Sequence, residues 1–269
     1  MFKHLRWIAV LPLICLIFVI GCGGDEEEMD NDTSVITPTE TDLPDYFPNT
    51  IGSRWAYRNS NGFEWAREVT DTRFISGNTY HVFAYDPPLE NPPFDYLRTP
   101  SYRTTIIGVF FFVGGEINQS VQTSLKEFYE ALFADSGNVK VNVNTSSKSD
   151  LTFFRLPPIR GKKWEVINMK IVGNIVFQDF GNFQIPFEMN WVVTGVVERE
   201  ETVETPAGVF ENSFKIQYDS KLTTIVEGEE ETDRELTDIV WIAPEVGIVK
   251  IQSDDVVAEL ISYDVKPAE

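Results

Sequence analysis

The chain has 269 residues, with 42 Asp or Glu against 22 Lys or Arg, which gives a formal net charge of −20. A field of this sign repels a phosphate backbone, so we expect no nucleic-acid partner. Of the two cysteines and two histidines, Cys15 and His4 lie within the first 21 residues, which we expect to be removed as a signal peptide. Cys22 and His81 remain, and they are too few for a zinc site built from Cys and His ligands. The sequence has no phosphate-binding or dinucleotide-binding glycine motif, so we expect neither a metal nor a cofactor.

The N-terminus has the three parts of a secretory signal: a charged start, a short apolar core and a small-residue cleavage site. Lys3 and Arg6 supply the charge, and residues 8–20 are apolar apart from Pro12. Residues 19–22, Val-Ile-Gly-Cys, resemble a bacterial lipobox. This pattern predicts a signal peptide over residues 1–21. It also predicts a lipidated Cys22, carrying acyl chains such as palmitate, as the membrane-bound mature N-terminus.

The alternative is an uncleaved membrane anchor, but the apolar segment is shorter than the roughly 20 residues that a spanning helix needs. Residues 22–45 follow as an acidic segment that is too poor in apolar residues to fold, and we expect a disordered tether. Gly23, rather than Asp, follows the cysteine. This favours an outer-membrane lipoprotein of the cell envelope and leaves open which face of the membrane it occupies.

Residues 46–265 have the pattern of one β-rich domain, because short runs of β-branched and aromatic residues alternate with turn signals. The clearest example is a strand over 210–219, in which Phe210, Phe214, Ile216 and Tyr218 face one side. The polar residues of this strand face the other side, namely Glu211, Ser213, Lys215, Gln217 and Asp219. Asn61-Gly62 is a strong hairpin signal. We expect a single curved antiparallel sheet or half-barrel.

One α-helix is expected, over about residues 123–135, packed on the sheet. Ser124 and Glu127 form a capping box, and Leu125, Phe128 and Leu132 share one face.

Two Gly-x-x-Trp segments, which end at Trp55 and Trp164, show a weak internal similarity within the sequence. It indicates either two duplicated halves, about 46–115 and 155–265, or a coincidence between two strand entries.

No catalytic residue is predicted. His81 is the only histidine after the signal, and no Gly-x-Ser-x-Gly elbow accompanies it. Carboxylates are abundant enough for a hydrolase that uses two of them, but most lie in the tether, in turns or on polar strand faces. We therefore expect a protein that is not an enzyme, with a carboxylate-based hydrolase as the minor alternative.

The candidate ligand-binding residues are Phe110, Phe111 and Phe112. Three successive phenylalanines on a strand face both sides of a sheet, so either both sides are covered or one side lines an apolar pocket. A covered core with an exposed patch would favour a non-catalytic binding or interaction module with a protein partner. An enclosed cavity at this place would favour the alternative, a carrier of a lipid or another apolar ligand.

Three short segments resemble an uncharacterised family of β-rich bacterial lipoprotein and secreted domains. They are 46–57 (Tyr-Phe-Pro, then Gly-x-x-Trp-x-Tyr), 206–216 (Pro-Ala-Gly-Val-Phe, then Phe-Lys-Ile) and 241–250 (Trp-Ile-Ala-Pro, then Gly-Ile-Val-Lys). The resemblance implies a curved antiparallel sheet, similar to the half-barrels of periplasmic lipoprotein carriers, and no established activity. Members of the family usually have Gly where this chain has Glu245.

Overall fold

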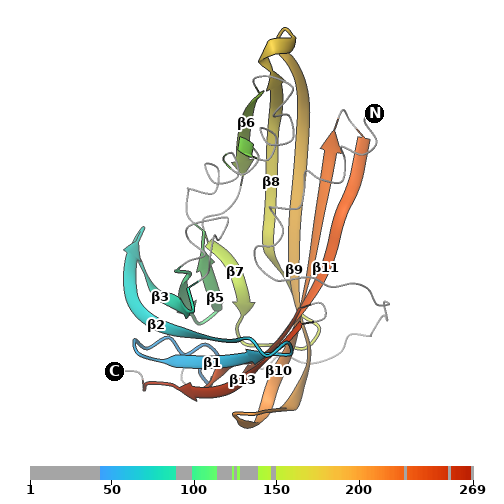
Figure 1. The fold of residues 1–269 in the computed structure, drawn as a ribbon. Coiled ribbons are helices and arrows are strands. Elements are labelled where there is room, and N and C mark those ends of the chain that lie inside the picture. The colour runs from blue at the N-terminus through green and yellow to red at the C-terminus, as the bar shows by residue number, and fades with distance from the viewer. Residues whose placement is uncertain are drawn as a thin grey trace.

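The computed structural model describes residues 43–88, 99–113, 123, 126–127, 139–146, 150–226, 229–253 and 256–267. These residues form one antiparallel sheet of 13 strands (Figure 1) and a short 3-10 helix, η2 (Gln178–Phe180). The first seven strands are β1 (Arg54–Asn59), β2 (Glu64–Ile75), β3 (Asn78–Asp86), β4 (Ser101–Thr105), β5 (Gly108–Phe112), β6 (Val139–Ser146) and β7 (Asp150–Arg155). The others are β8 (Lys163–Phe177), β9 (Phe183–Thr205), β10 (Gly208–Val226), β11 (Glu229–Ala243), β12 (Gly247–Ser253) and β13 (Val256–Asp264).

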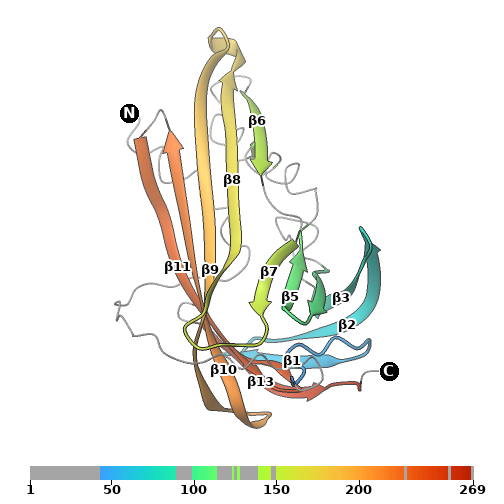
Figure 2. The ribbon, with the colours of Figure 1, turned by 180° about the vertical axis from the view of Figure 1, so that it is seen from behind.

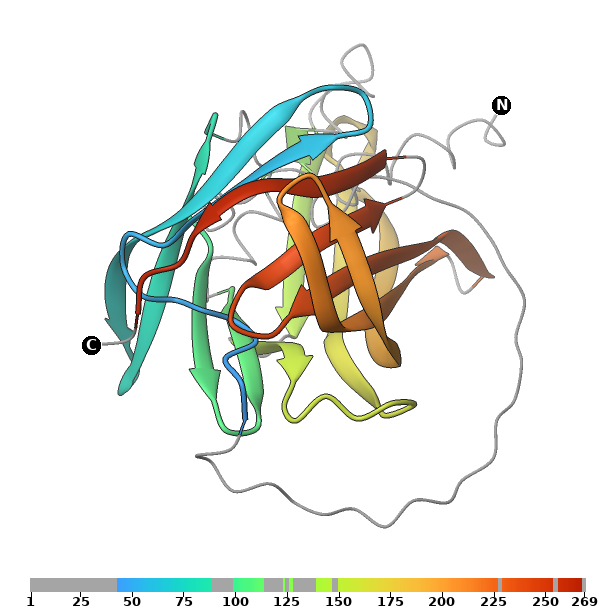
Figure 3. The same cartoon turned by 90° about the horizontal axis from the view of Figure 1, so that it is seen from below.

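The sheet has the order β6-β8-β9-β10-β11-β12-β13-β1-β2-β3-β4-β5-β7. Its shorter strands curve strongly, whereas the long hairpin strands β8 to β11 extend well beyond them (Figures 1 and 2). Seen from below, the strands wrap around a common interior (Figure 3). The described sheet ends in two edge strands, β6 and β7, and is therefore open. The predicted single curved antiparallel sheet is confirmed.

Two of the sequence predictions about domain organisation remain untested. The predicted helix over about 123–135 lies almost wholly outside the described residues. The two proposed halves correspond to β1–β5 and β8–β13, which form two continuous blocks joined by the pairing of β13 with β1. Their duplication stays a prediction.

The strand predicted over 210–219 is confirmed in most of its length. Ile216 and Tyr218 are buried, and Asp219 is exposed. The prediction is wrong at Ser213, which is fully buried although it was assigned to the polar face. The reason is a bulge between Phe210 and Ser213, where the register with β9 shifts. Asn212 has a left-handed φ of 55° in this bulge.

The hairpin at Asn61-Gly62 is also confirmed, because it connects β1 to β2. Gly62 has φ of 88°, which glycine adopts without the steric penalty of a side chain, and its N–H donates to the Asn59 carbonyl over 2.8 Å. Tyr57 and Trp65 pair directly across the hairpin, and their rings stack with centroids 4.4 Å apart.

The segment that precedes β1 fills the interior of the curved sheet. Phe47 is 2% exposed, and its ring lies 5.1 Å from that of Tyr102 and 5.9 Å from that of Phe153. Two hydrogen bonds hold the start of the segment, since the Glu245 N–H donates to the Asp45 carbonyl and the Asp45 N–H donates to the Glu245 carboxylate. The C-terminal end of the tether is therefore part of the folded domain.

Candidate functional site

The three candidate phenylalanines lie on β5 and face both sides of the sheet, as the strand period predicts. Phe111 lies in the core, 8% exposed, with its ring centroid 5.1 Å from that of Tyr102. Phe110 and Phe112 are half-buried on the opposite face. The structure therefore divides the predicted group between the packed interior and the outer face, and does not bring the three rings together.

The outer face around Phe110 and Phe112 carries an ion pair. Arg103 donates two hydrogen bonds to one carboxylate oxygen of Asp150, at 3.0 and 2.7 Å, and Tyr80 donates to the other oxygen at 2.6 Å. The Arg103 guanidinium also lies over the Phe110 ring, 4.3 Å from its centroid, and Tyr80 lies 5.2 Å from Phe112. Burial, followed by the hydrogen bond to Asp150, raises the pKa of Tyr80. This cluster ties β3, β4, β5 and β7 together.

The interior contains a buried cation that the sequence did not reveal. Arg67 is 7% exposed, and its guanidinium carbon lies 4.8 Å from the Trp55 ring, 5.4 Å from Phe83 and 5.5 Å from Phe47. Its Nε has no hydrogen-bond partner among the described residues. Cation–π contacts with several rings offset part of the cost of burying the charge. One sequence signal could have placed Arg67 in the interior. Side chains alternate along a strand with a period of two, which puts Arg67 on the same face as Val69.

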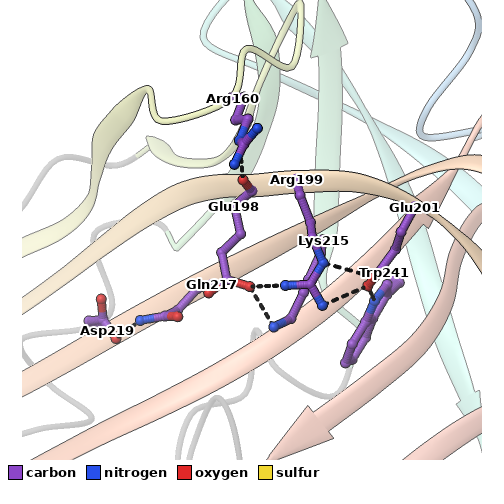
Figure 4. A network of polar contacts seen from close by, with 8 residues as sticks. All are labelled: Arg160, Glu198, Arg199, Glu201, Lys215, Gln217, Asp219 and Trp241. Carbon is purple, nitrogen blue, oxygen red and sulfur yellow. Dashed lines mark hydrogen bonds and ion pairs between the residues drawn. The ribbon is translucent and has the colours of Figure 1, made fainter. Parts of the chain in front are cut away.

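A network of polar contacts covers the outer face of β9, β10 and β11 (Figure 4). Lys215 lies 2.5 Å from Glu198, and Arg199 lies 2.8 Å from Glu201. The indole of Trp241 donates to Glu201 over 2.6 Å. Strand register aligns a row of mostly charged residues across this face, namely Arg199, Lys215, Trp241, Lys250 and Glu259.

The chemistry of this network differs from that of a carboxylate acid–base pair. Burial by itself would raise the pKa of Glu201, but the hydrogen bonds from Trp241 and Arg199 outweigh it and the pKa is lowered. Glu198 is paired with Lys215. A general acid needs a raised pKa, so these ion pairs favour a structural role. Trp241 is 7% exposed, which leaves little of its ring for a ligand to stack on.

His81 lies on β3 and is half-buried. Burial lowers its pKa, and a backbone hydrogen bond with Asn49 opposes this shift. Among the described residues, no three His, Cys, Asp or Glu side chains are grouped closely enough to hold a metal ion. Within the same part of the chain, no helix has the length and apolarity to cross a membrane. Cys22, the predicted lipidation site, and the signal peptide lie outside the described residues.

Comparison with known proteins links part of the chain to a family. Residues 182–265, from the start of β9 to the end of β13, match the DUF3108-like family. This match confirms the predicted resemblance to an uncharacterised family over that part of the chain. No curated protein matches the sequence.

Two solved structures are similar to this chain. One is a candidate lipoprotein from Parabacteroides distasonis ATCC 8503, with 14% identity and a TM-score of 0.41, covering 83% of this chain and all of the other. The second is a candidate exported protein with a YmcC-like fold from Bacteroides fragilis NCTC 9343, with 15% identity and a TM-score of 0.42, covering 82% of this chain and all of the other.

Proposed function

We propose that this chain is a lipid-anchored lipoprotein of the cell envelope whose β domain is a non-catalytic interaction module. The lipobox-like segment ending at Cys22 supports the anchor. Gly23 after the cysteine favours the outer membrane. The acidic segment that follows separates the lipid from a domain whose described part begins at residue 43.

The packing of the interior favours the interaction module over the lipid carrier. Aromatic rings from strands that are far apart in the sheet contact each other there, as Phe153 of β7 does with Tyr218 of β10, 5.9 Å apart. Phe47, from the segment before β1, packs edge-on against the same Phe153 ring. Burial raises the pKa of both Tyr102 and Tyr218, as expected for a dry interior. The chain's own rings therefore take the place that an apolar ligand would need.

Native mass spectrometry of the unlipidated mature chain, residues 22–269 with Cys22→Ala, tests this function. We expect the protein at its sequence mass, with no apolar molecule released by solvent extraction. A stoichiometric lipid or other apolar mass would overturn the module and make the carrier the better function. Adding a fatty acid and a phospholipid before the measurement covers ligands that the expression host lacks, and we expect neither to bind in the interior.

A further inference from the structure

The tip of the β8–β9 hairpin exposes two apolar rings, outside the site described above. Phe180 is 63% exposed and Phe183 is 55% exposed, and both rings contact the buried Phe177 at centroid distances of 6.5 and 6.3 Å. Gly181 and Asn182 take left-handed φ values of 73° and 60° at the turn. This turn geometry places the side chains of Phe180 and Phe183 on the surface of the hairpin tip.

The hairpin around this tip is nearly free of charge. In a chain with a formal net charge of −20, Asp179 is the one charged residue between Lys170 and Glu188. Lys170 and Glu188 themselves form an ion pair of 2.6 Å at the base of this segment. Apart from Asp179, which directly precedes Phe180, the segment around the two exposed rings is therefore uncharged.

The tip also projects beyond the neighbouring hairpin. β10 pairs with β9 as far as Phe187, whereas β8 pairs with β9 as far as Phe183. At about 3.3 Å per residue, the tip extends about 13 Å past the end of β10. Figures 1 and 2 show it as the far end of the molecule, with η2 at its top.

From these observations we infer that Phe180 and Phe183 form a second membrane contact, inserted into the interface of the bilayer that holds the lipid on Cys22. The inference rests on the proposed anchor, because the anchor confines the domain to a bilayer surface. Two exposed phenylalanines on an almost uncharged hairpin are suited to the apolar side of that interface, where burying their surface is favourable.

The length of the tether permits this contact even if the hairpin stands upright on the bilayer. Glu245, which binds the end of the tether, follows Ile242 closely in sequence, and Ile242 is level with Glu200 of β9 through its pairing with Phe214. From Glu200 to Phe183 the strand measures about 56 Å. The 21 residues from Cys22 to Asp42 span about 70 Å when extended.

The test places a fluorescent probe next to the tip of the lipidated chain. With Cys22 acylated and Cys15 removed with the signal, an introduced cysteine is the one free thiol. Gln184→Cys puts an environment-sensitive nitrobenzoxadiazole label beside Phe183, and Asn78→Cys puts it at the exposed β2–β3 turn as the matched control. On reconstitution into phosphatidylcholine vesicles, we expect the emission at position 184 to shift to shorter wavelength and that at position 78 to stay at its aqueous value.

The double substitution Phe180→Ser/Phe183→Ser should return the emission at position 184 to its aqueous value, with the circular dichroism spectrum unchanged. Phe74→Ser, which removes a phenylalanine that is 77% exposed on another hairpin, should leave the shift intact. An aqueous emission at position 184 in the anchored wild-type chain would overturn the inference. So would an equal loss of the shift in Phe74→Ser.

A second measurement separates the failure of the tip from the failure of the anchor. The unlipidated Cys22→Ala chain is floated with excess phosphatidylcholine vesicles, and we expect its weak partition coefficient to fall at least tenfold in the double variant. If mass spectrometry finds no lipid on Cys22 while this tenfold loss holds, the anchor is wrong and the tip is right. A concentration-dependent blue shift in the absence of vesicles would overturn the membrane contact and assign the tip to a second copy of the chain.

Discussion

At the scale of single residues, glycines in the long strands make room for large side chains on their neighbours. Gly195 of β9 pairs with Trp164 of β8, and a Cβ built at position 195 would overlap the indole ring. Trp164 is 5% exposed and packs edge-on against Tyr218 at 6.1 Å. The indole is therefore confined between a bare backbone and a fixed ring.

Gly195→Ala should lower the free energy of unfolding by about 1–3 kcal/mol, the usual range for overpacking a filled core. The cause would be the clash with the indole ring, so a smaller ring should relieve it. We expect Gly195→Ala to be less destabilising in a Trp164→Phe background, measured by urea unfolding of all four proteins in the cycle. Additive effects would show that the indole is not the group displaced.

The lowered pKa of His81 predicts how the stability of the domain depends on pH. Its pKa is lowered in the folded protein by burial, so below the unfolded-state value of about 6.5 the unfolded chain binds the proton more readily. Stability should therefore decrease as the pH falls from 7 to 5.5. We expect a smaller decrease in His81→Gln, measured as the thermal midpoint at several pH values. The same slope in both proteins would contradict this assignment.

At the scale of elements, the segment before β1 acts as a structural part of the sheet interior. It joins the end of the tether to the β11–β12 turn through Asp45 and Glu245. It also places Phe47 against rings from β3, β4 and β7. An element without regular secondary structure therefore connects strands that lie far apart in the sheet.

Phe47→Ala should destabilise the domain by about 3–5 kcal/mol, as removal of a fully buried phenylalanine does. The matched control is Phe74→Ala, at a phenylalanine that is 77% exposed, and we expect a change within about 0.5 kcal/mol. Urea unfolding followed by tryptophan fluorescence measures both. An equal loss of stability in the two variants would show that Phe47 contributes no more to the core than an exposed phenylalanine does.

Sequence patterns predicted the features that depend on neighbouring residues. The period of two identified the face of Ile216 and Tyr218, and Asn61-Gly62 identified the first hairpin, because both signals are local. The bulge at Ser213 broke the period, since an inserted residue changes which side the following residues face. Glu245, which stands where members of the resembled family usually have Gly, adopts a left-handed φ of 62° in the turn after β11, the conformation that glycine favours.

The aromatic surroundings of Arg67 could not be predicted, because they depend on contacts between distant parts of the chain. Phe83 approaches Arg67 from the paired strand β3, whereas Phe47 reaches it from the segment before β1, which the local pattern of β2 does not reveal. Likewise, the three phenylalanines at 110–112 were correctly placed on both faces of a strand. Which face would be covered by the interior rings depended on the fold of the whole sheet.

At the scale of the whole molecule, the domain combines an interior filled by its own aromatic rings, an outer face of paired charges and an aromatic hairpin tip. The pairing of β1 with β13 joins the two ends of the domain. Under the proposed function, the domain acts by presenting these surfaces to a protein partner. In this account, the lipid on Cys22 determines where those surfaces are presented.

The most direct test of this account is the fate of Cys22 in a bacterial expression host fed labelled palmitate. We predict that the wild-type chain incorporates the label, lacks residues 1–21 and sediments with membranes, and that Cys22→Ala carries no label and keeps its signal peptide. Incorporation of the label into Cys22→Ala at the wild-type level would contradict lipidation at Cys22. A wild-type chain that keeps residues 1–21 without label would show that the uncleaved signal is the anchor.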